Sequence, residues 1–354
     1  MPLMVCMLLL LLSGLAVLYG TSLASDTMEI FHKQLLFALI ALGGFIFVSL
    51  IDYHALSKQN RLAYIAILAT LLYLLFLGPE IRGGKRWIDL GIGTFQPSEF
   101  VKISVAIGLA RLLHLRRGQI NSWKILFWSM AYAGLPAALV LLQPDLGSAL
   151  VTCGIWTGLI LMSPIKKKYI AVLGLIGLLL AAGVWQFGLK DFQKDRIKVF
   201  MNPELDPRGK GYNVRQATIA IGSGGIFGRG LASGLQSQNR FLPERQTDFI
   251  FAAGSEQIGF FGSLGLLSLF VFAGYRLLAI AKRARDDLGM YLALGVFFLL
   301  WIHAIVNIGM NMGLMPVTGI PLPFLSAGGS GLVVMLFAFG IAQNVAIQSK
   351  ILRF

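Results

Sequence analysis

The chain is poor in charge, since only 13% of its 354 residues are Asp, Glu, Lys or Arg. Soluble domains carry roughly 25%. Hydrophobic residues make up 56% of the sequence, and the mean hydropathy is +0.76. Several apolar runs reach the ~20 residues that are needed to cross a hydrocarbon core of ~30 Å. These figures exclude a soluble globular domain and predict an all-α polytopic membrane protein.

Cysteine, histidine and acidic residues are also scarce. Cys6 and Cys153 both lie in apolar runs, so there is no disulfide framework, and the four histidines are scattered without metal-ligand spacing. Asp and Glu number 16 against 30 Lys and Arg, which gives a net charge of +14. In a membrane protein this excess indicates loop charge and contacts with membrane lipids, not a nucleic-acid partner. No repeat of fixed period is visible, which argues against an inverted-repeat transporter.

The apolar runs predict about ten transmembrane helices in one integral membrane domain, 1–354. The first run lacks a basic leader and is longer than the ~7–15 residues of a signal-peptide core, so we predict a retained helix. The predicted spans are 3–20, 31–50, 61–78, 98–114, 127–143, 147–163, 168–187, 249–280, 288–312 and 326–348.

Basic residues set the predicted orientation. Lys and Arg are frequent in the short loops that lie on the same side of the membrane as the N-terminus, whereas few lie in the short loops on the other side. Both termini are therefore predicted to be cytoplasmic. The long segment 188–247, between helices 7 and 8, is then a basic extracytoplasmic loop. Its stretch 212–230 mixes a helix-like pattern with glycine turns, which predicts partial order. Such a loop indicates an anionic substrate reached from outside or from the outer leaflet.

A carboxylate, Asp248, stands where this loop enters the eighth span, in the stretch NRFLPERQTDFIF. Position alone leaves two interpretations open: a helix cap, or a chemical group at the mouth of a cavity. Arg240 and Arg245 nearby could form an interfacial ion-pair cluster or bind substrate. Glu256 follows ~12 Å deeper on the same helix. For Glu256 we favour a structural hydrogen bond between helices.

A second polar cluster precedes the fourth span. A glycine turn presents Lys85, Arg86 and Trp87, and a Pro-Ser-Glu sequence then starts a helix. Glu99 and Lys102 are i,i+3 neighbours that can pair on one helix face. This pair could be purely structural. Alternatively, Lys102 and Arg86 could hold a pyrophosphate while Trp87 packs on an acyl chain or a sugar.

Two further stretches are candidates for a site. Asp145 lies between the fifth and sixth spans, beside a proline that fixes the turn, and capping is its expected job. Residues 313–331, GLMPVTGIPLPFLSAGGSG, hold three prolines and no charge. At membrane depth such irregular backbone must be buried in protein or line a cavity.

These stretches together resemble the SEDS family (shape, elongation, division and sporulation), in particular its rod-shape, RodA-type branch. The matching motifs are GGKRWIDLG and FQPSE with Lys102 at 83–102, QPDLGSAL at 143–150, DPRGKGYN and IAIGSGG with the glycines after it at 206–230, SQ and FLPERQTDFIFA at 237–252, and NIGM with GIPLPFLSAGGS at 307–330. They run in the family order over nearly the whole chain.

The resemblance implies a ten-helix peptidoglycan glycosyltransferase of the bacterial cytoplasmic (inner) membrane, with its active site facing outside. Such enzymes join lipid II units into glycan for cell elongation, with undecaprenyl pyrophosphate as the leaving group, and work with a class B penicillin-binding protein. The family's essential aspartate corresponds to Asp248. The chain departs from the family at Gln246, where histidine is frequent, and at Gln257, where an acid is frequent. It also begins almost directly at the first span, so we expect that the start assigned to it could be late.

Glycosyl transfer needs a base for the attacking hydroxyl and cations for the leaving pyrophosphate. We expect Asp248 to be the base and Lys102, Arg86, Arg240 and Arg245 to supply the cations. A divalent cation could also balance the charge, although no acid cluster demands one. The rival hypotheses are a flippase for the lipid-linked precursor, a secondary transporter, and a scaffold that recruits a transpeptidase.

Overall fold

The computed structural model describes residues 2–24, 27–80, 84–89, 91, 93–189, 191–202, 205–206, 209–234, 241–242 and 244–349. In this part of the chain the fold is all-α, apart from a short antiparallel pair of strands. The elements are α1 (Pro2–Leu23), α2 (Met28–Leu50), α3 (Tyr53–Leu77), β1 (Ile88–Asp89), β2 (Thr94–Phe95), α4 (Pro97–Leu115), η1 (Arg117–Gln119), α5 (Trp123–Leu142), α6 (Leu146–Leu161), α7 (Lys167–Gly183), η2 (Val184–Gly188), α8 (Asp191–Met201), α9 (Lys210–Ser223), α11 (Ile250–Lys282), α12 (Asp287–Asn311) and α13 (Gly329–Gln348).

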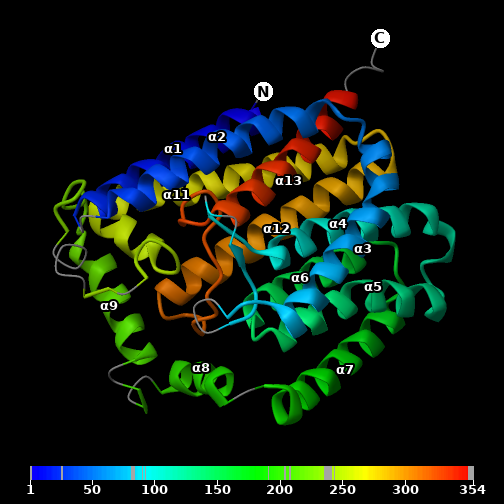
Figure 1. Cartoon of the computed structure of the whole chain (residues 1–354). Helices are drawn as coiled ribbons and strands as arrows, with labels where there is room; N and C mark the ends of the chain where they lie inside the picture. Colours follow the sequence, from blue (N-terminus) through cyan, green and yellow to red (C-terminus); the bar gives the residue numbers. More distant parts are fainter. Residues whose placement is uncertain are drawn as a thin grey trace.

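The helices form an elongated bundle around α4 and α12, which pack against each other (Figure 1). On one side α2 lies along α13, and α1 lies along α11. On the other side α4 contacts α3, α5 and α6. Helix α7 stands apart from the bundle at its lower edge in Figure 1. The chain returns from α7 through α8 and α9, and α9 packs on α11.

Eight of the described helices are long and apolar enough to cross a membrane. The other two predicted spans correspond to α4, which is less apolar because it carries charged residues, and to α6, which is apolar but has only 16 residues. An all-α polytopic fold is thus confirmed, while the ten-span topology and its orientation remain predictions.

Helix boundaries differ from the predicted spans where a local signal was overlooked. Helix α3 begins at Tyr53 and not near residue 61, because Asp52 caps it by accepting a hydrogen bond from the His54 backbone N–H at 2.9 Å. Helix α13 begins at Gly329 and not at residue 326, because the preceding segment is irregular. The predicted partial order of the long loop is confirmed by α8 and α9.

The glycine turn after α9 docks onto a break in α11. At Gly259 the φ angle is +68°, which interrupts the helix that the sequence predicts to be continuous. The turn fills the break with backbone hydrogen bonds, among them Arg229 N–H to Glu256 O at 3.0 Å. Gly228 and Gly259 approach so closely that a methyl group on either would overlap the backbone of the other. The glycines of this motif therefore serve packing, as only glycine permits this contact.

Candidate functional site

A cavity of about 380 Å³ opens where the first turns of α4, α6 and α13 face the turn before α11. This volume is within the range of small-molecule sites. The cavity gathers polar residues from segments that are far apart in the sequence. Its polar and charged lining comprises Arg86, Trp87, Thr94, Gln96, Glu99, Lys102, Asp145, Ser148, Arg196, Glu244, Thr247, Asp248, Thr318 and Ser330.

Asp248 lies in this cavity, in the turn that leads into α11. The helix begins two residues later, with Phe249 at the N-cap position and no side-chain cap bond, so of the two interpretations left open for Asp248 the helix cap is wrong. The side chain of Asn311 does this work instead, since its Oδ1 accepts a hydrogen bond from the Ala252 N–H at 3.0 Å. The carboxylate of Asp248 is thereby left for the cavity.

The backbone of Asp248 is held by a neighbouring helix. Asn307 and Asn311, one turn apart on α12 and fully buried, both donate from Nδ2 to the Asp248 carbonyl at 3.0 Å. Ser326 donates from Oγ to the carbonyl of Thr247 at 2.6 Å. Hydrogen bonds between buried groups are costly to break, so this turn is fixed relative to α12. The position of Asp248 is therefore determined by contacts that lie outside its own helix.

The carboxylate of Asp248 receives no hydrogen bond from the residues that the structure describes. Burial raises its pKa to about 6, and the nearby charge of Glu244 adds to this, while Arg196 and Arg86 act in the opposite direction. Gly319 faces the carboxylate, because a methyl group at its Cα would lie 3.5 Å from Oδ2. A carboxylate with a pKa near neutrality and no internal partner is well placed to accept a proton.

Two guanidinium groups line the same cavity. Arg86 lies over the ring of Trp87 at 4.4 Å, and Arg196 donates from Nη1 to the carbonyl of Thr318 at 2.8 Å. Within the described part of the chain, the Nε–H of each arginine is buried without a hydrogen-bond partner. Unpaired buried donors are rare in folded proteins. Two of them on cations, in one cavity, indicate a site for an anionic group.

Lys102 is bound by side chains of the protein itself. Its ammonium pairs with Glu99 at 2.5 Å and donates to Nε2 of His303 at 3.1 Å, while Nδ1–H of His303 donates to the carbonyl of Leu299 at 2.7 Å. All three side chains are buried, and this tautomer of His303 follows from the two hydrogen bonds.

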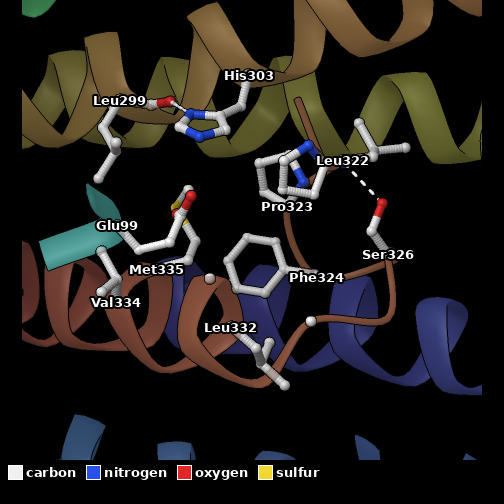
Figure 2. A pocket seen from close by; sticks show the side chains of 13 residues that line it. Glu99, Leu299, His303, Leu322, Pro323, Phe324, Ser326, Leu332, Val334 and Met335 are labelled. Carbon is white, nitrogen blue, oxygen red and sulfur yellow. Dashed lines mark hydrogen bonds between the residues drawn. The ribbon is translucent and has the colours of Figure 1, made fainter. Parts of the chain in front are cut away.

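A small chamber of about 20 Å³ lies behind this cluster. Figure 2 shows Glu99 and His303 pointing into it, opposite Phe324. Its lining is mostly apolar, and Glu99, His303 and Ser326 are the polar side chains that face it. Glu99 lines both the chamber and the main cavity, and it is the charged residue that the two spaces have in common.

Asp145 caps α6, as predicted, by accepting from the Ser148 N–H at 3.0 Å. Its other oxygen accepts from Gln96 at 3.0 Å and from Ser98 at 3.2 Å. Gln96 in turn accepts from the indole N–H of Trp87 at 3.2 Å. Asp145 therefore joins the start of α4, the start of α6 and the strand pair into one rigid wall.

The irregular segment before α13 fulfils both parts of its prediction. Several of its apolar side chains are buried, among them Leu322 and Phe324, while its residues 318–321 and 327–328 line the cavity. The hydroxyl of Ser326 donates to Thr247 O and accepts from the Leu322 N–H at 2.8 Å, which closes the turn shown in Figure 2. The segment connects the chamber wall to the turn that carries Asp248.

Some predicted site residues do not reach the cavity. Lys85 is exposed and Arg245 does not line it. Glu256 is fully buried, and its Oε1 accepts from Ser223 on α9 at 3.5 Å, a contact between helices of the kind predicted for it. Arg240 lies outside the described residues.

Sequence reasoning missed Arg196, His303 and the pair of asparagines on α12. Arg196 lies in a charged loop segment, where nothing distinguishes it from solvated neighbours. His303 is an isolated histidine in an apolar run. The asparagines do carry a signal, because their i,i+4 spacing puts two amides on one face of an apolar helix. Among the described residues no group of three or more His, Cys, Asp or Glu is arranged to hold a metal ion.

Comparison with known proteins gives a family for this chain. A profile of the FtsW/RodA/SpoVE family, described as cell cycle protein, matches residues 1–351. The peptidoglycan glycosyltransferase MrdB of Escherichia coli strain K12 is 37% identical over 315 residues, which cover 88% of this chain and 85% of the relative. The stage V sporulation protein E of Bacillus subtilis strain 168 is 36% identical over 359 residues, covering 98% and 97%.

Solved structures agree. A chain from work described as structural coordination of polymerization and crosslinking by a peptidoglycan synthase complex has a TM-score of 0.78 at 26% identity, covering 97% of both chains. The crystal structure of the Thermus thermophilus rod shape determining protein RodA has a TM-score of 0.70 at 25% identity, covering 98% of this chain and 96% of that one. The chain is thus a multi-pass membrane protein that belongs to the FtsW/RodA/SpoVE family, also called SEDS.

Proposed function

We propose that this protein is a peptidoglycan glycosyltransferase that polymerises lipid II into glycan strands for cell elongation and rod shape. The observation that carries the proposal is the pairing, in one cavity, of an unbonded carboxylate, Asp248, with the unpartnered Nε–H donors of Arg86 and Arg196. A base beside two cations is what glycosyl transfer from a pyrophosphate requires. Relatives that carry this activity in their names support the assignment.

Asp248 is the general base in this proposal. It takes the proton from the 4-hydroxyl of the acceptor lipid II, and the oxygen attacks the anomeric carbon of the donor chain. A bond to oxygen forms as the bond to the pyrophosphate breaks, with inversion and without a covalent enzyme intermediate. A pKa of about 6 leaves the carboxylate mostly ionised at pH 7 and makes it a stronger base than an ordinary aspartate.

Arg86 and Arg196 stabilise the charge that develops on the leaving undecaprenyl pyrophosphate. Guanidinium groups suit this task because they bind phosphate oxygens with directed hydrogen bonds. Lys102, by contrast, has a positioning role, since Glu99 already balances its charge. Trp87 is available to pack on a sugar or an acyl chain beside Arg86.

The cavity faces the outside of the bacterial inner membrane in this proposal, because the positive-inside rule puts the turn before α11 on that side. The substrate then enters from the outer leaflet beneath the basic loop 188–247. A class B penicillin-binding protein is the proposed partner. A structural relative from a complex of polymerization and crosslinking supports it.

The test is glycan-strand formation from purified lipid II by the protein with its cognate transpeptidase. Replacing Asp248 by Asn keeps the shape of the side chain and removes its basicity. We expect a loss of about 10²–10⁴-fold in rate. The charge-matched control is Asp89→Asn, an exposed carboxylate on β1 that lies outside the cavity lining.

Normal polymerisation by a folded, partner-bound Asp248→Asn variant would overturn the assigned base. If the wild type makes no glycan with a competent partner but moves lipid II across proteoliposome membranes, the rival flippase hypothesis is correct. Loss of polymerisation in the variant while any lipid transfer persists would support the enzyme.

A further inference from the structure

A second large pocket lies at the opposite end of α4 from the catalytic cavity. It has a volume of about 520 Å³ and lies between the start of α3, the end of α4 and the start of α5. Arg111 is nine residues beyond Lys102 on α4, so the pocket lies ~14 Å further along the helix axis. Helices α3, α4 and α5 pack against one another and lie on one side of Figure 1. Nothing in the proposed reaction uses this pocket.

The pocket is positively charged without compensation. Lys58, Arg61, Arg111, Arg116 and Lys124 line it, and no carboxylate does. None of these five forms a salt bridge in the described part of the chain. Five cations around one hollow repel one another, and this arrangement is stable only where water, salt or an anionic ligand screens them. An anion with phosphate-like charge is the matching occupant.

The floor of the pocket is rigid and polar. Asn60 is buried and donates to the carbonyl of Ser104 at 2.9 Å and to the hydroxyl of Tyr132 at 3.4 Å. Tyr132 stacks on Tyr64 at 4.1 Å between ring centroids. Gly108 lets α4 approach this ring, because a methyl group there would collide with the Tyr132 hydroxyl. The hollow is therefore held open by fixed side chains.

One side of the pocket is apolar and open. Leu115 and Trp128 line it while being 64% and 55% exposed, and Leu62 and Ile65 next to it on α3 are 74% and 54% exposed. Helices α3 and α5 both qualify as membrane spans. Trp is typical of membrane–water interfaces. A ligand with a charged head and apolar chains fits this surface better than a soluble phosphate does.

We infer that this pocket binds the phosphate headgroup of an anionic phospholipid, with its acyl chains along α3 and α5. The predicted orientation puts the site in the cytoplasmic leaflet, opposite the proposed polymerase cavity. Basic pockets between membrane helices on the cytoplasmic side are a recurrent way to hold such headgroups. The inference does not depend on the proposed catalytic function, since it concerns binding alone.

The test measures lipids retained by the delipidated full-length protein, by native mass spectrometry with phosphatidylglycerol or phosphatidylcholine. We expect at least about tenfold preference for phosphatidylglycerol, and loss of that preference in Lys58→Gln/Arg61→Gln and in Arg111→Gln/Lys124→Gln. The charge-matched control is Lys282→Gln/Arg283→Gln, two exposed residues at the end of α11 outside the pocket. The control should retain the lipid within about twofold of the wild type.

Equal retention in wild type and both pocket variants, measured on protein that stays monodisperse and helical, would overturn the inference. So would equal binding of phosphatidylcholine. A second arm adds glycerophosphoglycerol, the same headgroup without acyl chains. If it displaces the lipid at equal concentration, the pocket binds soluble phosphates; if an acidic peptide displaces the lipid at lower concentration, the pocket is a protein-docking site. Either result would replace the lipid assignment.

Discussion

The two walls of the cavity that holds Asp248 differ in how their charges are balanced. On the wall built from α4 and α6, Glu99 is paired with Lys102, and Asp145 accepts three hydrogen bonds from Gln96, Ser98 and the Ser148 backbone. On the opposite wall, the carboxylate of Asp248 has no hydrogen bond from any described residue. The first wall holds the structure together, and the second leaves its donors and acceptors for a substrate.

This difference separates the hydrogen-bonded acids of the cavity from Asp248, the acid that we propose as the base. Glu99, Asp145 and Asp248 line the same space, as does Glu244 in the turn before α11, so proximity alone does not identify the base. An acid whose lone pairs are already occupied has little left to accept a proton from a ligand. Stability variants and activity variants should therefore fall on opposite walls.

On the wall built from α4 and α6, here called the paired wall, the largest expected effect of a substitution is a loss of stability. Lys102→Met leaves the charge of Glu99 buried without a partner, which should destabilise the fold by about 3–5 kcal/mol. The double variant Glu99→Gln/Lys102→Met should recover most of this loss, because no buried charge remains. Thermal unfolding in detergent measures both. An unchanged melting temperature in the single variant would mean that Glu99 is not held as an ion there.

On the wall that carries Asp248, here called the open wall, a substitution of Arg196 should affect activity more than stability. Replacing it by Gln removes a charged donor from the cavity, and hydrogen bonds to charged groups contribute ~1.5–3 kcal/mol, so kcat/KM should fall about 10–100-fold. The melting temperature should change little. Lys198→Gln is the control on the same helix, because Lys198 is exposed and pairs with Asp195 outside the cavity. A similar loss of activity in both variants would point to a general effect of the charge of α8.

The pH dependence of polymerisation should report Asp248. Since its pKa is raised to about 6, the rate should fall about tenfold per pH unit below that value and level off above it. An ordinary aspartate would put this change near pH 4. Arg196 lowers the pKa of Asp248, so Arg196→Gln should shift the acid limb to higher pH. A profile that stays flat down to pH 5 would contradict the role of this carboxylate.

The smallest expected effect compares two aspartates. Asp145→Ala should lower stability by about 1 kcal/mol through loss of the α6 cap. Asp248→Asn should not lower it. Because the folded-state pKa of Asp248 is raised, its ionised form disfavours the fold increasingly as pH rises from about 4 to about 6, and Asn removes that cost above this range. A drop in melting temperature at pH 7.5 for Asp248→Asn would reverse the contrast.

Much of the paired wall could be predicted from local sequence. The pairing of Glu99 with Lys102 and the cap formed by Asp145 both follow from short-range sequence rules. The burial of the proline-rich segment before α13 was also predictable from its composition. The cap interpretation of Asp248, by contrast, could not be rejected from the sequence. An aspartate before a helix is a good cap candidate, and only the three-dimensional contact with Asn311 shows that the position is already occupied.

The open wall depends on contacts between distant segments. Arg196 meets the carbonyl of Thr318 across more than a hundred residues of sequence, and α8 shows no local sign of this contact. Likewise, the role of His303 is visible only from its hydrogen bond with Lys102 on another helix. The break at Gly259 was missed because it depends on the glycine turn that fills it. Long-range placement, and not residue type, is what a single sequence leaves undetermined.

That break also decides how the protein could be re-engineered. A designer who transplants the long loop between members of this family would naturally cut at the start of α11. The backbone contact between Gly228 and Gly259 shows that the exchangeable unit extends through the first turns of that helix, to about Phe261. A chimaera joined at Ile250 would combine the glycine turn of one protein with the α11 break of another. Only a graft that carries both the turn and the break keeps their backbone contact intact.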